Sequence, residues 1–237
     1  MTSIPIDLKN KALETPNINA AVVCPNEESV LLAVIEAKEI NLINPILIGK
    51  KSLIEKTANQ VNLEINSYDI IEINNEEEAA TVACKLAHEN KVKIIIKGNL
   101  HTDILMRYYL KKEFNLIVGR RLSHIWHMTA QKLNKPLFIT DGALNVLPRV
   151  EIKLQILKNA VDFCNKLNIF KPKVAILSGT EDPIDSMPSS IEAQKVMELA
   201  NKENVDALVH GPLAFDNAIS EEAAKIKNIK NEVAGKA

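Results

Sequence analysis

The sequence has 237 residues, of which 46% are hydrophobic and 25% charged, and its formal net charge is −1. This is the composition of an ordinary globular protein, and the small net charge excludes a global basic field that would recruit nucleic acid. The three cysteines form no C-x-x-C pair, which argues against a disulfide framework or a metal site and favours a reducing compartment. No apolar run approaches the ~20 residues of a membrane span, so we expect a cytoplasmic protein without membrane or nucleic-acid partners.

In the first hundred residues, short β-branched runs alternate with segments of helical period. We predict strands at 20–24, 46–49, 68–73 and 92–96, and helices at about 27–40, 51–58 and 76–89. Asn74 and Asn75 are placed to cap the last of these helices, whose first turn is acidic. This alternation predicts an α/β fold with a mostly parallel sheet covered on both faces.

The middle of the chain differs from this pattern. Residues 122–128 and 136–140 resemble strands separated by a polar turn, and they form either an antiparallel pair or a crossover between two domains. A helix at about 149–167, a strand at 174–177, a helix at about 191–201 and a strand at 207–209 follow. We therefore expect two α/β domains, residues 1–133 and 134–237.

Polar or glycine-bearing residues directly follow the predicted strands. The carboxyl ends of parallel strands meet at one edge of a sheet, where ligands bind in α/β proteins. A site for an anionic ligand is one interpretation, and ordinary polar turns are the other. The residues concerned are Lys97-Gly98-Asn99, Asp141-Gly142, Ser178-Gly179-Thr180 and His210-Gly211-Pro212.

Arginine is scarce in this lysine-rich chain, yet Arg120 and Arg121 are adjacent and follow a glycine. Guanidinium groups bind phosphate in a bidentate manner, although such a pair is also common in a solvated turn. A nucleophilic role for Ser123 with His124 as its base is disfavoured, because neighbouring residues of a strand point to opposite faces.

Segments spread over nearly the whole chain resemble the phosphate acetyltransferase and phosphate butyryltransferase family. No single motif is diagnostic, but their order along the chain is specific. The matching segments are Glu36-Ala37-Lys38-Glu39, Ile43 to Gly49, Lys97-Gly98 with His101-Thr102, Gly119 to His124, Ile139-Thr140-Asp141 with Asn145, Val174 to Ser178, Met187-Pro188-Ser189, Gly211 to Asp216, and Val233-Ala234-Gly235.

The resemblance implies two α/β domains of the isocitrate/isopropylmalate-dehydrogenase type with a cleft between them, in a homodimer. It implies reversible transfer of an acetyl group between coenzyme A and inorganic phosphate, as part of acetate metabolism. Phosphate would attack the thioester directly, with no metal and no cofactor, since coenzyme A is a substrate. Proximity and electrostatic stabilisation would then supply the catalysis.

The resemblance also implies roles for individual residues. It assigns catalysis to Arg107, Arg121 and Ser123. It assigns contacts with the substrate or coenzyme A to Lys97, Thr102, Asp141, Asn145, Ser178, Gly211, Pro212 and Leu213.

The family pattern continues beyond Val233-Ala234-Gly235, so we expect a second domain that is shortened at its C-terminus. Three readings of the function follow: a phosphate acetyltransferase, a phosphate butyryltransferase, or a shortened family member that binds coenzyme A or acyl phosphate with little activity. An isocitrate-dehydrogenase-like enzyme is disfavoured, because nothing in the sequence matches that family's metal-binding carboxylates.

Overall fold

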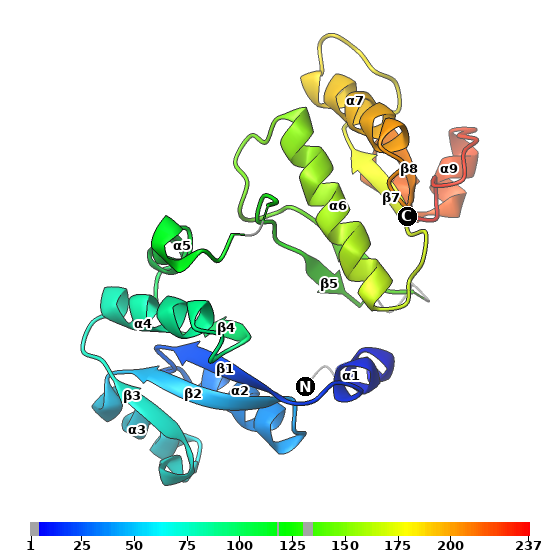
Figure 1. The fold of residues 1–237 in the computed structure, drawn as a ribbon. Coiled ribbons are helices and arrows are strands. Elements are labelled where there is room, and N and C mark those ends of the chain that lie inside the picture. The colour runs from blue at the N-terminus through cyan, green and yellow to red at the C-terminus, as the bar shows by residue number, and fades with distance from the viewer. Residues whose placement is uncertain (1–4, 118, 130–134) are drawn as a thin grey trace. The chain divides into compact units, whose positions relative to one another are not determined.

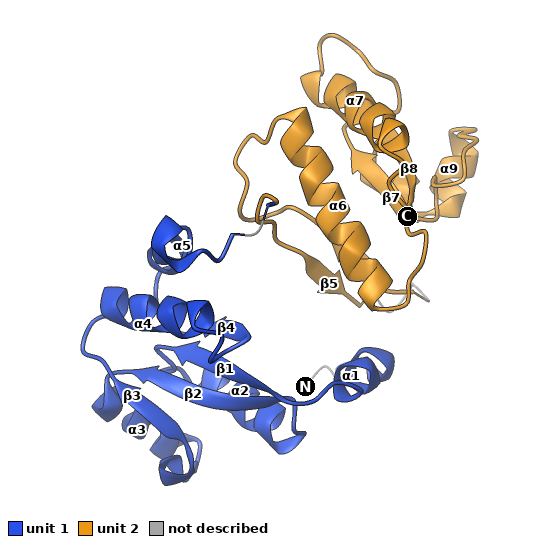
Figure 2. Cartoon of the chain, viewed as in Figure 1, with its two compact units in different colours: residues 1–119 blue, residues 120–237 orange. Residues whose placement is uncertain are grey.

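The computed structural model describes residues 5–117, 119–129 and 135–237. The chain divides into two compact units, residues 1–119 and 120–237 (Figure 2). The domain boundary expected between residues 133 and 134 falls outside the described residues, and so does most of the polar turn expected before residue 136. Residues 120–129 group with the second unit.

Unit 1 is built around a parallel sheet of four strands in the order β3-β2-β1-β4 (Figure 1). The α/β prediction is therefore confirmed, while α1 and α5 are helices that the sequence pattern did not predict. The elements are α1 (Ile6–Leu13), β1 (Ile18–Val23), α2 (Glu28–Glu39), β2 (Ile43–Gly49), α3 (Lys51–Gln60), β3 (Asp69–Glu72), α4 (Glu76–His88), β4 (Ile94–Lys97) and α5 (Thr102–Tyr109).

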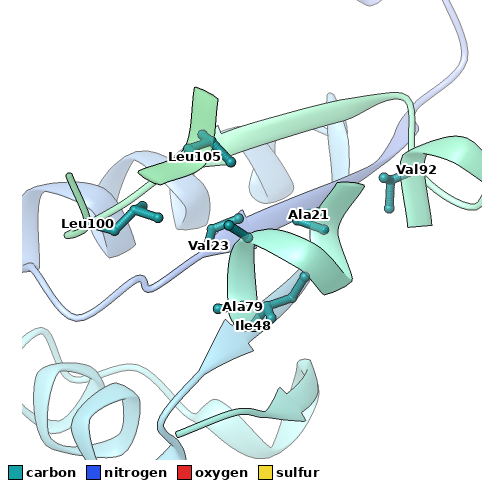
Figure 3. Close-up of a cluster of buried hydrophobic side chains, with 9 residues drawn as sticks. Ala21, Val23, Ile48, Ala79, Val92, Leu100 and Leu105 are labelled. Carbon is teal, nitrogen blue, oxygen red and sulfur yellow. The ribbon is translucent and has the colours of Figure 1, made fainter. Parts of the chain in front are cut away.

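The core of unit 1 lies on both faces of this sheet. Because side chains alternate along a strand, Val23 of β1 packs against Ala79 of α4 on one face (Figure 3). Val22 faces the other way and packs with Leu31 of α2 and Ile54 of α3. All of these side chains are at most 1% exposed. Because these strands are covered on both sides, they appear in this half of the sequence as continuous apolar runs.

Asparagine defines many of the helix ends. Asn75 caps α4, where its side-chain oxygen accepts from the Glu78 backbone N–H at 2.7 Å. Helices α2, α3, α4, α6, α7 and α9 are each followed, two residues after their last residue, by an asparagine of positive φ. Asparagine tolerates this left-handed conformation better than other non-glycine residues, and the turn satisfies the last helical carbonyls. These residues are Asn41, Asn62, Asn90, Asn168, Asn204 and Asn228.

Unit 2 contains an antiparallel pair, β5 with β6, and a parallel pair, β7 with β8. Figure 1 labels β5, β7 and β8. Of the two interpretations of residues 122–140, the antiparallel pair is confirmed. Helices α6 and α7 pack against one side of the parallel pair. The elements are β5 (Trp126–Met128), β6 (Leu137–Ile139), α6 (Val150–Lys166), β7 (Lys173–Leu177), α7 (Pro188–Lys202), β8 (Leu208–Leu213), α8 (Phe215–Ile219) and α9 (Glu221–Ile226).

One sequence prediction about unit 2 was wrong. Gly211 and Pro212 were expected in a turn after the strand, but they lie inside β8, which ends at Leu213. The register between β7 and β8 shifts at this point, between the pairs Ala175–His210 and Leu177–Leu213. A proline cannot donate to a strand ladder, and such an irregularity beside a single described neighbouring strand accommodates it.

Candidate active site

The loop after β6 in unit 2 is organised by a carboxylate. Oδ1 of Asp141 accepts from the backbone N–H groups of Ala143 and Leu144, each at 3.0 Å. Just before it, the Thr140 hydroxyl donates to the carbonyl of His124 at 2.6 Å and ties the loop to the segment that leads into β5. An Asp that receives two successive backbone amides fixes a tight turn. The predicted Asp141 therefore has a clear structural role.

Asn145 connects this carboxylate to an arginine. Its Nδ2 donates to Asp141 Oδ2 and, at 2.9 Å, to the carbonyl of Leu122. Its Oδ1 then accepts from Nε of Arg121 at 2.9 Å. Both amide atoms are therefore oriented by their partners, since a carboxylate and a carbonyl can only accept. Three predicted residues, Arg121, Asp141 and Asn145, form one network.

The terminal nitrogens of Arg121 are not used by this network. Among the residues that the structure describes, neither Nη atom of Arg121 has a hydrogen-bond partner, and the side chain is exposed. A guanidinium that is held at Nε and free at both Nη atoms offers two parallel N–H donors to an incoming oxyanion. This geometry suits a phosphate or carboxylate ligand.

Hydrogen bonding also determines the ionisation state of Asp141 in this loop. Burial raises the pKa of the Asp141 carboxyl, but the N–H groups of Ala143 and Leu144 and the amide of Asn145 together lower it. The net result is a pKa below the ordinary value of 3.8. Asp141 is thus an anion at neutral pH, and it supports Arg121 through Asn145 without pairing directly with the guanidinium.

Ser123, the other predicted site residue of the segment 120–124, is half-buried. Its hydroxyl oxygen accepts from Nδ2 of Asn159 on α6 at 2.9 Å. Helix α6 was predicted, but its contact with this segment was not. The available signal was a polar stripe at helical spacing, formed by Gln155, Asn159 and Asp162.

A second group of predicted residues lies where β7 and β8 end. The Ser178 N–H donates to the carbonyl of Leu213 at 2.9 Å, and its hydroxyl lies 2.8 Å from that of Ser189. Gly211 and Leu213 are buried within β8, and so is Pro212. A Cβ at Gly211 would lie 2.7 Å from Cβ of Ile176, so this glycine allows close strand packing.

A hollow of about 500 Å³ lies in unit 2 beside the end of β8. Leu213 and His210 contribute to its wall, together with Glu181 and Lys227. The Lys227 ammonium lies 3.5 Å from the Glu181 carboxylate. Burial lowers the pKa of His210 below 6.5, so its imidazole is neutral at pH 7. Leu213, predicted to contact the substrate or coenzyme A, therefore lines a hollow within unit 2.

The remaining predicted residues lie in unit 1, between the end of β4 and the end of α5. The ammonium of Lys97 donates to the carbonyls of Gly98 and Leu100, at 3.1 and 2.9 Å. Thr102 is the exposed first residue of α5. Arg107, on the same helix, is 58% exposed, and its two Nη atoms lie 3.4 Å from carboxylates of Glu77 and Asp103.

The described residues also bear on metal binding and on membrane insertion. Within 5–117, 119–129 and 135–237, no three His, Cys, Asp or Glu side chains gather in a way that would hold a metal ion. Over the same ranges, no helix combines the length and the apolar character needed to cross a membrane.

Comparisons with known proteins identify the family of the chain. The family model described as "Phosphate acetyl/butaryl transferase" matches residues 75–237, a range that includes every predicted site residue. A phosphate acetyltransferase of Rickettsia felis is 38% identical over 98% of this chain and 67% of its own length. A phosphate butyryltransferase of Clostridium beijerinckii is 33% identical over 98% of this chain and 77% of its own length.

Among solved structures, a branched-chain phosphotransacylase from Enterococcus faecalis V583 matches with a TM-score of 0.77 and 27% identity, over 93% of this chain and 77% of the other. A phosphotransacetylase from Streptococcus pyogenes shares the fold, with a TM-score of 0.77 at 20% identity, over 99% of this chain and 80% of that one. The chain spans about two thirds of the length of the Rickettsia relatives, from 63% to 67%.

Proposed function

The chain belongs to the phosphate acetyl/butyryl transferase family, and from this premise we propose that it transfers an acetyl group reversibly between coenzyme A and inorganic phosphate. The protein is then an acyltransferase of acetate metabolism. Support comes from four relatives named phosphate acetyltransferase, which are 38% to 39% identical over 90% or more of this chain.

The observation that carries the proposal is the way in which the Arg121 guanidinium is held. Its guanidinium is held at Nε by Asn145, 2.9 Å away, while both Nη atoms lack partners among the described residues. Two parallel N–H donors fit the oxygens of inorganic phosphate. The half-buried hydroxyl of Ser123 lies in the same segment and supplies a further donor.

In the proposed reaction, a phosphate oxygen attacks the carbonyl carbon of acetyl-CoA. A C–O bond forms, the C–S bond breaks, and the coenzyme A thiolate leaves and takes up a proton. Arg121 and Ser123, with Arg107, would stabilise the charge on phosphate and on the carbonyl oxygen. Coenzyme A is a substrate, and we propose that no other cofactor is needed.

The other predicted residues are proposed to bind or shape the site. Asp141 and Asn145 would act by holding Arg121, as their hydrogen bonds indicate. The remaining proposed contacts with acetyl-CoA come from Lys97, Thr102, Ser178, Gly211, Pro212 and Leu213. A homodimer and a cytoplasmic location complete the proposal.

Phosphate butyryltransferase is the second candidate. The named butyryltransferase relatives are matched over 77% of their length, more than the Rickettsia acetyltransferases. In addition, Val146 and Leu147 directly follow Asn145 and are 89% and 92% exposed. Two apolar side chains beside the network would favour a longer acyl chain.

Thiol release from acetyl-CoA and from butyryl-CoA, each with inorganic phosphate, tests the two candidates. We expect faster turnover of acetyl-CoA, and a loss of about 100-fold in kcat/KM for Arg121→Ala or Arg107→Ala. Arg149→Ala is the matched control, because Arg149 is exposed and its side chain makes no hydrogen bond within the described ranges. Wild-type turnover equal to that of Arg121→Ala on both substrates would contradict an acyltransferase function.

A further inference from the structure

Helix α6 presents a polar stripe to the segment that carries the proposed catalytic residues. Gln155, Asn159 and Asp162 are separated by four and three residues, so they lie on one face of the helix. Oε1 of Gln155 accepts from the backbone N–H of Arg121 at 2.8 Å. The Asp162 carboxylate lies 2.6 Å from Nη1 of Arg120. The stripe thus holds the segment by its backbone and by its first arginine.

Asn159, at the centre of the stripe, makes the most specific contact. Its Nδ2 donates to the carbonyl of Arg121 at 2.8 Å and to the hydroxyl oxygen of Ser123 at 2.9 Å. A carbonyl can only accept, so the nitrogen of the amide must face it. Both Nδ2 protons are then used, and Oδ1 faces Arg120, whose Nη1 is 3.5 Å away. The orientation of this amide is therefore determined by its surroundings.

This orientation decides what the Ser123 hydroxyl can do. Its oxygen accepts a hydrogen bond from Asn159, so its own proton must point in another direction. Across the described part of the chain, no hydrogen bond donated by the Ser123 hydroxyl is found. The hydroxyl is left as a donor for a ligand, next to an arginine whose Nη atoms are likewise without partners there.

We propose that Asn159 is a positioning residue for acyl transfer, which directs the Ser123 hydroxyl proton toward a substrate oxygen, either of the thioester carbonyl or of phosphate. The inference rests on the function proposed above. A preoriented donor costs no reorganisation as negative charge develops on the oxygen, which is why it lowers the barrier. Asn159 itself touches no substrate in this scheme and acts only through Ser123 and Arg121.

The sharpest test is Asn159→Asp, which keeps the size of the side chain and an oxygen toward Arg120 but removes both donor hydrogens. The introduced carboxylate would accept from Ser123 and turn its proton away from the substrate. We expect kcat for acetyl-CoA and phosphate to fall about 100-fold, with KM changed by less than about threefold. Ser123→Ala should lose about as much, and the double variant should lose no more than either single variant.

Asn201→Asp is the matched control, because Asn201 is exposed on α7 and its side chain makes no hydrogen bond among the described residues. Thermal unfolding of each variant separates positioning from stability. A kcat for Asn159→Asp equal to that of Asn201→Asp would overturn the inference. So would losses that multiply in the double variant, since they would show that Asn159 and Ser123 act independently.

Failure of the proposed function is recognisable on its own, as absence of wild-type turnover with both thioesters. In that case, exchange of the Asn159 side-chain amide protons in wild-type protein is followed by nuclear magnetic resonance. Slow exchange of both protons, with one of them accelerated in Ser123→Ala, supports the hydrogen bond from Asn159 to Ser123. This support does not depend on acyl transfer. Fast exchange of both protons in the wild type overturns the inference.

Discussion

The two units use the same kinds of element but fix their strand ends in different ways. In unit 1, the residues after β4 pack against the sheet itself, and a Cβ at Gly98 would lie only 2.3 Å from the carbonyl oxygen of Cys24. In unit 2, the residues after β6 are held by side-chain hydrogen bonds, from Asp141 through Asn145 to Arg121. The central strands β1 and β2 of unit 1 contain side chains buried on both faces of the sheet, whereas β7 contains no buried residue.

The strand ends of unit 1 are thus held by close packing, whereas the loop after β6 in unit 2 is held by hydrogen bonds, which are directional. Apolar burial stabilises a unit strongly but does not orient a polar group. Hydrogen bonds contribute less free energy each, yet they fix which atom of a side chain faces a ligand. The network in unit 2 leaves the ends of an arginine and a hydroxyl proton without partners among the described residues. That is the arrangement that binding of an anion requires.

The largest expected effect compares Gly98, which follows β4 in unit 1, with Gly142, which follows β6 in unit 2. Gly98→Ala would place a Cβ 2.3 Å from the Cys24 oxygen and 2.6 Å from that of Val23, so backbone must move. We expect the free energy of unfolding of unit 1 to fall by about 4 kcal/mol. Gly142→Ala is the matched change in unit 2, where no described atom lies within 4 Å of the new Cβ, and it should change stability by less than about 0.5 kcal/mol.

Hydrogen exchange followed by mass spectrometry assigns each effect to its unit, because peptides from the two units are measured separately. Equal effects of the two alanines would contradict the distinction between packed and hydrogen-bonded strand ends.

The next effect compares one leucine from each sheet. Leu47 in β2 is 0% exposed, and Leu177 at the end of β7 is 47% exposed. Leu47→Ala removes buried methyl groups and leaves a cavity, so we expect a loss of about 3 kcal/mol in unit 1. Leu177→Ala should cost unit 2 about 0.5 kcal/mol, since half of that side chain is already in water. Urea denaturation measures both, and a larger loss for Leu177→Ala would refute the comparison.

A smaller effect tests the carboxylate in unit 2. We expect Asp141→Asn to lower the free energy of unfolding by about 1.5 kcal/mol at pH 7, because two backbone amides and Asn145 donate to a charged acceptor. The folded-state pKa lies below 3.8, so the wild-type advantage is complete above that value and is lost as pH falls through the lower folded pKa.

Urea denaturation at pH 7 and at successively lower pH should therefore show the two curves converging in acid. Asp185→Asn is the control, because Asp185 is exposed and its side chain has no hydrogen-bond partner in the described ranges. A difference between wild type and Asp141→Asn that persists unchanged below the folded pKa would argue against the hydrogen-bonded carboxylate.

The smallest effect tests what the two units share. Asn90 in unit 1 and Asn204 in unit 2 follow helices α4 and α7 with φ of 57° and 51°. We expect Asn90→Ala and Asn204→Ala each to cost about 1 kcal/mol, and the corresponding glycine variants to be nearly neutral. Thermal unfolding measures all four variants. A penalty in only one unit would show that tertiary packing, rather than the local backbone, determines these helix ends.

Much of the fold was predictable because its signals are local. The parallel strands of unit 1 appear as apolar runs, and the acidic turn after Asn75 marks the start of α4. Helices α1 and α5 were not predicted, and Gly211-Pro212, a pair typical of turns, lies inside β8. Its place depends on the close approach of Ile176 in the neighbouring strand, and that contact has no local signature.

The site was predictable in part. Arg121, Asp141 and Asn145 were singled out from the sequence, and they form one hydrogen-bonded network. Asn159 was not singled out, since its partners are 36 and 38 residues away. A polar stripe on a helix is most often solvated, so its spacing alone could not identify a contact with Ser123.

The sequence by itself determined the α/β class, the family and the residue types suited to binding an anion, because periodicity and motif order are properties of neighbours along the chain. The tertiary structure decided which atoms of those residues are used in holding the protein together and which remain available to a ligand. Arg121 is held at Nε, and the Ser123 hydroxyl oxygen accepts a hydrogen bond from Asn159, so its own O–H remains available to donate. Hydrogen bonds between distant segments set these orientations, and such bonds exist only once the chain has folded.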